Sequence, residues 1–145
     1  MVDYGCGKGR VDYFLSYQTR CESVGVEYDE RIYKTAIENK QTAISAARTE
    51  FVLTDARVYE VPEDADRFYF FNPFSVEILR GVFRRIRESY YENPRELLLF
   101  FYFPSPEYIS YLMTVDELSF YDEIDCSDLF EENKDREKIV IFQLG

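Results

Sequence analysis

A short glycine-rich segment near the start of the sequence is the strongest candidate for a ligand-binding site. Gly5, Gly7 and Gly9 alternate with Cys6 and Lys8 directly after a short apolar stretch. Glycines at this spacing let the backbone turn sharply and approach a ligand closely. A helix that starts behind such a turn directs unpaired backbone N–H groups at the ligand. The segment therefore indicates a nucleotide-type binding site.

The spacing of these glycines argues against two common phosphate sites. The dinucleotide fingerprint G-x-G-x-x-G would place its third glycine where Arg10 stands, whereas the third glycine comes one residue earlier, at Gly9. A P-loop requires Gly-Lys followed by Ser or Thr at a set distance, and the sequence lacks it. The pattern thus disfavours NAD and excludes a P-loop.

An acidic residue follows the glycine segment at the sequence separation expected for a ligand-binding carboxylate. Glu27 comes 22 positions after Gly5, at the end of a β-branched and aromatic stretch that predicts a strand. An acid about 20 residues past a glycine turn is the usual acceptor for ribose hydroxyls in folds of this kind. The alternative is an ordinary surface acid. Because few structural roles require an acid at a strand end beside a glycine turn, the position favours ligand binding by Glu27.

Hydrophobic periodicity predicts the elements that would position these residues. It indicates a first helix with Val11, Phe14 and Leu15 on one face and an acidic loop over 125–137. Longer helices are predicted over 29–48 and 76–93, with a short one after Pro106. The second of the longer helices carries an apolar stripe at three- and four-residue steps, made of Val76, Leu79, Phe83, Ile86 and Tyr90. Strands are predicted at 1–4, 23–28, 51–54, 67–71, 97–103, 118–124 and 138–144, of which 67–71 is continuously apolar and is expected to be covered on both faces.

The order of these elements predicts an α/β fold. Strands alternate with helices through the fifth strand, and the last two strands are separated by a loop alone. This order predicts a mostly parallel sheet of about seven strands with an antiparallel C-terminal hairpin. The chain of 145 residues has the length of one domain.

Composition excludes several classes of function. A formal charge of −11 repels polyphosphate and makes non-specific nucleic-acid binding unlikely on physical grounds. The sequence has no His, which excludes His-based triads and His metal ligands, and its three Cys are too widely spaced for a zinc site. It contains neither an apolar run of about 20 residues nor a signal peptide. We therefore expect a cytoplasmic protein without a metal and without a membrane partner.

The segment from Asp3 to Gly9 resembles the acid-x-G-x-G-x-G signature of the class I S-adenosylmethionine-dependent methyltransferases. The resemblance implies a Rossmann-like sheet with helices on both faces and S-adenosyl-L-methionine as the cofactor. It implies that the Asp3 carboxylate holds the ammonium group of the cofactor, while Glu27 accepts from its ribose. Tyr28 would cover one adenine face, although it could equally be a core Tyr. The implied cofactor-binding turn comprises Gly5, Cys6, Gly7 and Gly9.

Two further strand ends match positions that the family uses. Asp55 and Ala56 would lie beside the adenine amino group and a ring nitrogen, although an Asp at a strand end is also a common turn or cap residue. Asn72, Pro73 and Phe74 resemble the Asn-Pro-Pro-aromatic motif of amino-group methyltransferases and would face the acceptor. Phe74 replaces the second Pro of that motif, and the alternative is a turn that ends the strand.

The resemblance implies a methyltransferase whose acceptor is unidentified, an amino nitrogen being one candidate. Almost nothing precedes Asp3, whereas members of the family usually carry N-terminal elements that cover the cofactor. We therefore expect residues 1–145 to be one methyltransferase-like domain that lacks such a lid. The alternatives are a non-catalytic S-adenosylmethionine-binding module and, disfavoured by the glycine spacing, an NAD-dependent oxidoreductase. The sequence leaves three classes of acceptor open: a protein side chain, a small metabolite and a nucleic-acid base.

Overall fold

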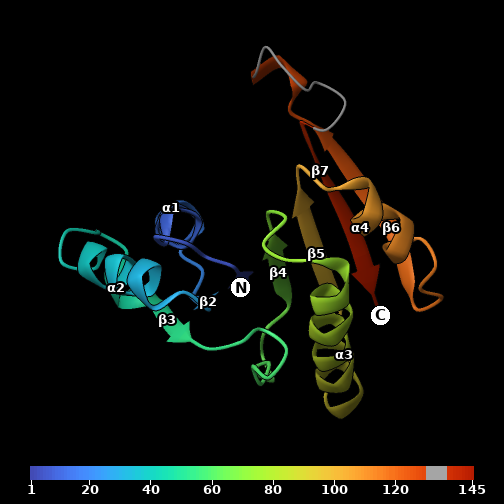
Figure 1. The fold of residues 1–145 in the computed structure, drawn as a ribbon, viewed down its shortest axis with the longest axis horizontal. Coiled ribbons are helices and arrows are strands. Elements are labelled where there is room, and N and C mark those ends of the chain that lie inside the picture. Colours follow the sequence, from blue (N-terminus) through green and yellow to red (C-terminus); the bar gives the residue numbers. More distant parts are fainter. Residues whose placement is uncertain (130–136) are drawn as a thin grey trace.

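A seven-stranded mixed sheet organises the chain (Figure 1), and the computed structural model describes it over residues 1–129 and 137–145. Within these residues the strands are β1 (Val2–Tyr4), β2 (Ser23–Glu27), β3 (Thr49–Leu53), β4 (Arg67–Phe70), β5 (Leu97–Tyr102), β6 (Leu118–Asp125) and β7 (Lys138–Leu144). The α-helices are α1 (Arg10–Thr19), α2 (Glu30–Asn39), α3 (Val76–Glu92) and α4 (Pro106–Leu112). Short 3-10 helices lie at Ala46–Arg48 and Ser127–Leu129.

The strand order, β3-β2-β1-β4-β5-β7-β6, reverses the direction of winding between β1 and β4. The pairs β1–β2, β2–β3, β1–β4 and β4–β5 are parallel. β7 runs antiparallel to both β5 and β6. The predicted mostly parallel sheet with an antiparallel C-terminal hairpin is thus confirmed. Open α/β sheets bind ligands at the carboxyl ends of the strands that flank such a reversal, here β1 and β4.

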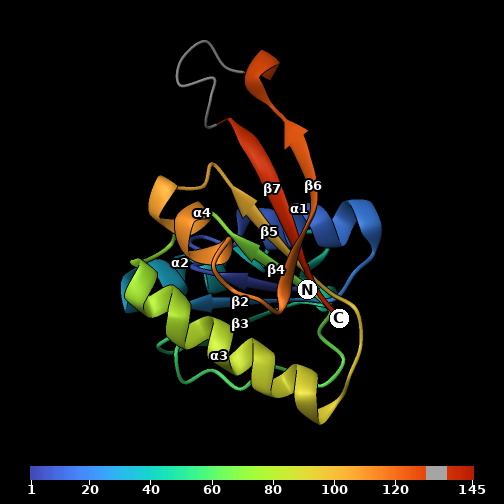
Figure 2. The same cartoon turned by 90° about the vertical axis from the view of Figure 1, so that its right-hand side faces the viewer.

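The helices cover the two faces of the sheet over different strands, which confirms the expected arrangement. In Figure 2, α3 and α4 lie in front of the sheet, and α1 and α2 lie behind it. Right-handed crossovers require this division, because the chain winds in one direction from β1 to β3 and in the other from β4 to β5.

The larger core lies between the sheet and α3. Leu79, Phe83 and Ile86 are at most 2% exposed and belong to one apolar cluster with Phe68 and Phe70 of β4. Their spacing of three and four residues places the α3 side chains on one face of the helix. The apolar stripe predicted for α3 therefore packs on β4, one of the two strands that flank the reversal.

The first helix packs on the sheet with a polar face. Asp12 and Ser16 of α1 are 0% exposed, whereas Phe14 is 59% exposed. The apolar face predicted for this helix is therefore not the face that covers the strands. The Ser16 hydroxyl lies 3.0 Å from the Ser23 hydroxyl of β2, and this hydrogen bond makes a buried polar position tolerable.

The second helix is shorter than predicted. The sequence predicts one helix over 29–48, but α2 ends at Asn39, and a turn follows. The Ser45 hydroxyl donates to the carbonyl of Tyr13 in α1 at 2.7 Å, and the Arg48 guanidinium donates to another carbonyl of the same helix. Because these contacts join residues about 30 positions apart, local helix propensity could not reveal them.

β4 is fully covered on one face only, so the expectation of two covered faces is wrong. Phe68 and Phe70 are 0% exposed, whereas Arg67 and Tyr69 on the opposite face are half-buried. The reason is that α1 and α2, the helices on that face, pack over β2 and β3.

The C-terminal strands carry the acidic loop predicted at 125–137. Residues 127–129 of this loop form a 3-10 helix, and residues 130–136 lie outside the part that the structure describes.

Across the described ranges, each helix falls short of the length and apolarity that crossing a membrane would take.

Candidate functional site

The glycine segment forms a tight turn between β1 and α1. The Gly5 and Cys6 amides both donate to the carbonyl of Val26, at 2.8 and 3.1 Å, and the Gly9 amide donates to the Cys6 carbonyl at 3.1 Å. Gly5, Gly7 and Gly9 have φ angles of 70°, 58° and 84°. Side chains other than glycine seldom adopt this left-handed backbone. The turn is thereby tied to the end of β2, where Glu27 stands.

Glu27 holds the glycine turn and the β2–α2 turn together. Its Oε1 accepts a hydrogen bond from the Gly7 amide at 3.0 Å, and its Oε2 accepts from the Tyr28 and Asp29 amides, each at 2.9 Å. The carboxylate is therefore fixed in position by the protein itself. Each carboxylate oxygen has two lone pairs, so Oε1, which accepts one hydrogen bond, retains capacity to accept from a ligand hydroxyl, whereas Oε2 already accepts two.

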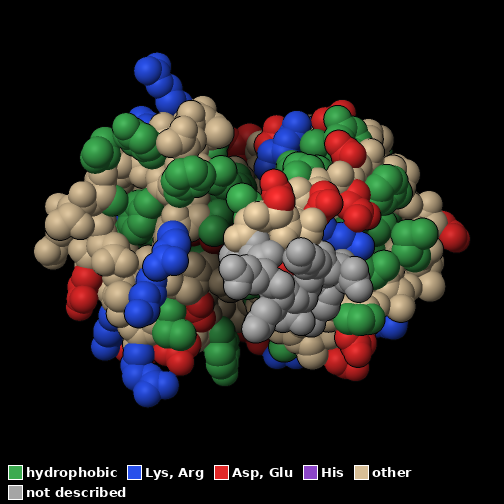
Figure 3. Space-filling view, turned by 90° about the horizontal axis from the view of Figure 1, so that it is seen from above, with side chains coloured by type: hydrophobic (Ala, Val, Ile, Leu, Met, Phe, Trp, Pro, Cys, Tyr) green, Lys and Arg blue, Asp and Glu red, His purple; other side chains and the backbone are tan. Residues whose placement is uncertain are grey.

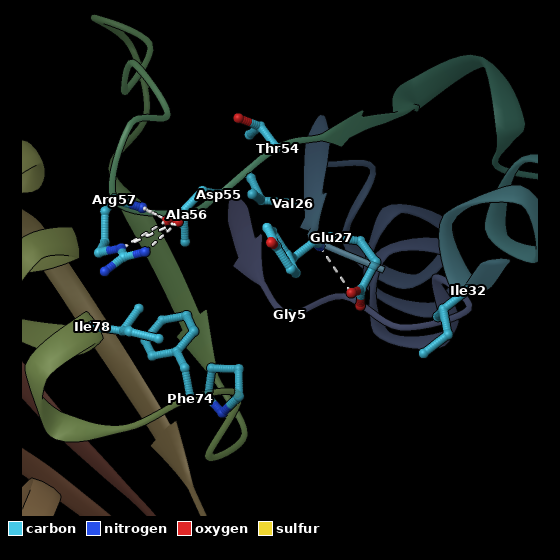
Figure 4. A pocket seen from close by; sticks show the side chains of 12 residues that line it. Gly5, Val26, Glu27, Ile32, Thr54, Asp55, Ala56, Arg57, Phe74 and Ile78 are labelled. Atoms are coloured by element: carbon cyan, nitrogen blue, oxygen red, sulfur yellow. Dashed lines mark hydrogen bonds and ion pairs between the residues drawn. The ribbon is translucent and has the colours of Figure 1, made fainter. Parts of the chain in front are cut away.

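A cavity of about 540 Å³ opens at the carboxyl edge of the sheet, beside the reversal between β1 and β4 (Figure 4). This volume lies within the range of small-molecule sites. In Figure 4, Glu27 and Ile32 lie across the cavity from Phe74 and Ile78. The lining residues are Gly5, Val26, Glu27, Tyr28, Ile32, Thr54, Asp55, Ala56, Arg57, Pro73, Phe74 and Ile78.

Asp55 is paired with Arg57 at the rim of the cavity. The Arg57 guanidinium donates to both oxygens of Asp55, the shortest contact being 2.6 Å from Nη2 to Oδ2, and the Arg57 amide donates to Oδ1 at 2.8 Å. These hydrogen bonds lower the pKa of Asp55. The Arg85 guanidinium donates to the Arg57 carbonyl at 3.1 Å, which anchors the segment on α3. Any adenine contact of Asp55 must therefore share its carboxylate with Arg57.

Asn72 bridges the turns that follow β4 and β5. Its backbone adopts the left-handed region with φ of 39°, which Asn tolerates better than most residues. Its Nδ2 donates to the carbonyl of Phe103, and its Oδ1 accepts from the Ser105 amide at 3.0 Å. The side chain is not part of the cavity lining. Asn72 thus fixes two neighbouring loops, and its contact with an acceptor stays a prediction.

Pro73 and Phe74 form the wall of the cavity next to the glycine turn. Pro73 packs directly against Gly5, and the Phe74 carbonyl accepts a hydrogen bond from the buried Tyr108 hydroxyl of α4. The Phe74 ring meets Phe70 edge-on, with 6.3 Å between the ring centroids. The segment after β4 is therefore held by the glycine turn on one side and by α4 on the other.

Two buried acids lie by the glycine turn. Asp3 is 3% exposed and Asp12 is 0% exposed. Their carboxyl groups interact, and burial raises the pKa of Asp3 well above its usual value and that of Asp12 to about 6. Neither oxygen of Asp12 accepts a hydrogen bond from a donor in the described part of the chain.

The cavity brings together many of the residues predicted from the sequence, from segments far apart in the chain. They are Gly5, Glu27, Tyr28, Asp55, Ala56, Pro73 and Phe74. Tyr28 is 77% exposed at the rim, which excludes the alternative of a core Tyr. Asp3, Cys6, Gly7, Gly9 and Asn72 do not line the cavity, and Cys6 packs instead with Ala36 and Phe51 in the smaller core.

Some lining residues carried no signal in the sequence. Arg57 follows Asp55 by two positions in a loop, where an Arg is common and its pairing cannot be read locally. Ile32 and Ile78 lie in the first turns of α2 and α3, and apolar residues there resemble ordinary packing positions. These residues line one cavity because the order of the strands places the segments that carry them side by side.

Comparison with known proteins identifies the fold through structure alone. The sequence matches no protein-family model and has no significant match among curated protein sequences. The glycopeptide N-methyltransferase MtfA, solved with S-adenosyl-L-methionine, is similar with a TM-score of 0.74 at 10% identity over 99% of this chain and 80% of that one. The methyltransferase domain of bacterial CtHen1-C gives 0.69 at 14% identity, over 99% and 88% of the two chains.

A third solved structure agrees. The TehB-like S-adenosylmethionine-dependent methyltransferase from Corynebacterium glutamicum has a TM-score of 0.66 at 18% identity, over 99% of this chain and 79% of that one. At these identities the likeness concerns the fold. The sheet order and the antiparallel β7 agree with it. The chain has the class I S-adenosylmethionine-dependent methyltransferase fold, a Rossmann-like α/β architecture.

Proposed function

We propose that this protein binds S-adenosylmethionine and transfers its methyl group to an acceptor. The observation that carries the proposal is the cavity beside β1 and β4, where the glycine turn, Glu27 and Asp55 meet. Similar structures include a methyltransferase solved with S-adenosyl-L-methionine and the same enzyme with S-adenosyl-L-homocysteine. A nucleoside fits the chemistry of the site, because a hydroxyl-accepting carboxylate faces apolar side chains across the cavity.

Different residues of the site are suited to bind different parts of the cofactor. Glu27, already fixed by three backbone amides, accepts from a ribose hydroxyl with the remaining lone pair of Oε1. Ile32 and Tyr28 offer an apolar and an aromatic surface to the adenine, which lies toward Asp55 and Ala56. The amino acid end lies on the glycine turn.

When bound, S-adenosylmethionine would supply a methyl group activated by attachment to a sulfonium sulfur. The chain's contribution is to hold the acceptor in line, and such positioning supplies most of the rate. Pro73 and Phe74 border the space for the acceptor, and Asn72 keeps their turn fixed against the β5–α4 loop.

The charge of the protein favours a cationic or neutral acceptor. On the face in Figure 3, Lys and Arg side chains are interspersed with Asp, Glu and apolar side chains. With a net charge of −11, the protein as a whole repels a polyanion. An amine, on a small molecule or a protein, is consistent with both the charge and the Asn72–Phe74 segment.

Calorimetric titration tests the cofactor directly. We expect S-adenosylmethionine and S-adenosylhomocysteine to bind and to raise the melting temperature, since a ligand that binds only the folded state stabilises it. NAD serves as the control and should give neither heat nor a shift. Heat or a melting-temperature shift with NAD and with neither of the other two ligands would contradict the assignment of S-adenosylmethionine as the cofactor.

A non-catalytic binding module is the second candidate. It is favoured by the incomplete motif, in which Phe74 and Ser75 replace a Pro and an aromatic residue, and by the engagement of the Asn72 amide with the β5–α4 loop. Incubation with cofactor carrying a tritiated methyl group in a cell extract separates the two. Label in a product supports the enzyme, whereas tight binding without transfer in any extract supports the module.

Removal of the Glu27 carboxylate is expected to weaken cofactor binding. We expect Glu27→Ala to weaken the free energy of cofactor binding by about 1–3 kcal/mol, because charge-assisted hydrogen bonding to the ribose is lost and the Gly7 amide loses its acceptor. Calorimetry on the folded variant measures the change.

The control is Glu30→Ala, in the first turn of α2. Glu30 pairs with Lys34 at 3.2 Å on an exposed surface and does not line the cavity. Such pairs contribute little, so the cofactor Kd should stay unchanged. Equal Kd values in the two variants would make Glu27 an ordinary surface acid.

A further inference from the structure

The ion pair of Asp55 and Arg57 lies at the end of the cavity where the proposed function places the base of the cofactor. In Figure 4 the pair is on the same side of the cavity as Ile78, across from Glu27. Among the residues that line the cavity in the described chain, Arg57 is the only cation. The pair brings both hydrogen-bond acceptors and donors to this end, and those that are still free decide what the base can contact.

The acceptors of Asp55 are fully used by Arg57. Oδ1 accepts from the Arg57 amide at 2.8 Å and from Nε at 3.1 Å, and Oδ2 accepts from Nε at 3.2 Å and from Nη2 at 2.6 Å. Each carboxylate oxygen has two lone pairs, so both oxygens are engaged. These hydrogen bonds also lower the pKa of Asp55, which keeps the carboxyl group ionised and without a proton to donate. An amino group on the base would find no free acceptor there.

The donors of Arg57 are only partly used. A guanidinium group carries five N–H groups, and Asp55 accepts from that of Nε and from one of Nη2. Among the described residues, no hydrogen bond or ion pair involves Nη1. The Arg57 side chain is 53% exposed, so its remaining N–H groups are accessible to a ligand in the cavity.

Contacts with α3 hold Arg57 in place. The Arg85 guanidinium donates to the Arg57 carbonyl at 3.1 Å. The methylene stem of Arg57 packs over Gly81, where an added Cβ would lie 3.0 Å from the Arg57 Cγ. Asp55 fixes the guanidinium itself. Because backbone, stem and head group are all anchored, little conformational freedom is left to lose when the guanidinium contacts a ligand.

We propose that Arg57, and not Asp55, contacts the base of the cofactor, and that the site does not select an amino group on the purine. An N–H donor can contact a ring nitrogen of adenine, or the carbonyl oxygen that replaces the amino group in hypoxanthine. An ionised carboxylate with free lone pairs would accept from the amino group and repel that oxygen. The inference rests on the proposed function, because it takes the ligand to be S-adenosylmethionine, and it replaces the role that the resemblance implies for Asp55.

Calorimetry with two ligands tests the proposal on the wild-type protein. S-Adenosylhomocysteine and S-inosylhomocysteine differ only in the purine, where an amino group is replaced by a carbonyl oxygen. The ratio of their Kd values therefore measures selection for the amino group. We expect the two Kd values to agree within about threefold, whereas a hydrogen bond from the amino group to a carboxylate would favour S-adenosylhomocysteine by about tenfold or more.

Arg57→Ala should create the selection that the wild-type protein lacks. The substitution frees the Asp55 carboxylate, so the preference for S-adenosylhomocysteine should rise to about tenfold or more. The matched control is Arg31→Ala. Arg31 also pairs with an Asp two residues earlier, Asp29 at 3.5 Å, but its side chain is 93% exposed and does not line the cavity. This variant should keep the wild-type ratio of Kd values.

Failure of this inference is distinguishable from failure of the proposed function. A wild-type preference for S-adenosylhomocysteine above about threefold, or a preference that folded Arg57→Ala leaves unchanged, would overturn the role of Arg57 and leave the cofactor assignment standing. If Arg57→Ala does not fold, the wild-type comparison decides alone. Absence of binding by S-adenosylmethionine, S-adenosylhomocysteine and S-inosylhomocysteine would contradict the proposed function, and the role of Arg57 with it.

Discussion

Gly5→Ala is expected to cost about 2–5 kcal/mol of folding free energy and, in protein that still folds, to abolish measurable cofactor binding. A Cβ on Gly5 would lie 2.3 Å from the Pro73 Cβ. Overpacking of this kind costs about 1–3 kcal/mol, and the left-handed backbone with φ of 70° adds about 1–2 kcal/mol. The turns after β1 and β4 would have to separate at the cavity. Urea unfolding and calorimetry measure the two effects.

Gly7→Ala provides the matched control for this substitution. Gly7 has a similar φ of 58°, but a Cβ there would meet no atom within 4 Å. Only the backbone strain of about 1–2 kcal/mol is expected. Equal losses of stability in the two variants would show that the contact between Gly5 and Pro73 does not constrain the site.

Asn72→Ala is expected to lower kcat by roughly 10²-fold with little change in the cofactor Kd. The substitution removes the hydrogen bonds to the Phe103 carbonyl and the Ser105 amide, which fix the turn beside the acceptor space. In the proposed function the cofactor would lie over the ends of β1, β2 and β3, away from those bonds. An acceptor must first be found, for instance through tritiated methyl transfer, and steady-state kinetics then measure kcat.

Asn72→Gly separates the lost hydrogen bonds from backbone strain. Glycine adopts the φ of 39° without cost, whereas alanine does not. If the side chain positions the acceptor, both variants lose turnover alike. Full turnover in either variant, or losses of turnover and cofactor affinity in proportion, would contradict a role for Asn72 at the acceptor.

Features encoded by short-range spacing were predictable. The stripe of Leu79, Phe83 and Ile86 predicts the buried face of α3, because three- and four-residue steps share one side of any helix. Gly5 and its neighbours predict a tight turn, and the structure shows that this turn uses the left-handed backbone that glycine adopts readily. Alternation of strands and helices then predicts the parallel sheet, whose carboxyl edge collects the residues that follow each strand.

Features that depend on partners distant in the chain were not predictable. α2 ends early because Ser45 and Arg48 bind carbonyls of α1, and α1 turns Asp12 toward the sheet despite an apolar stripe on another face. The pairing of Arg57 with Asp55 at the cavity and the bridge from Asn72 to the β5 loop are equally absent from the local pattern.

The sequence by itself therefore determined the order of the elements, the glycine turn and the acids that follow it, since each rests on backbone preferences and spacing within a few residues. Only the tertiary structure decided which side chains meet. The cavity between Glu27 and Phe74 exists because the winding of the sheet reverses between β1 and β4. Contacts of this kind depend on the three-dimensional packing of segments that are remote in sequence, which no local pattern encodes.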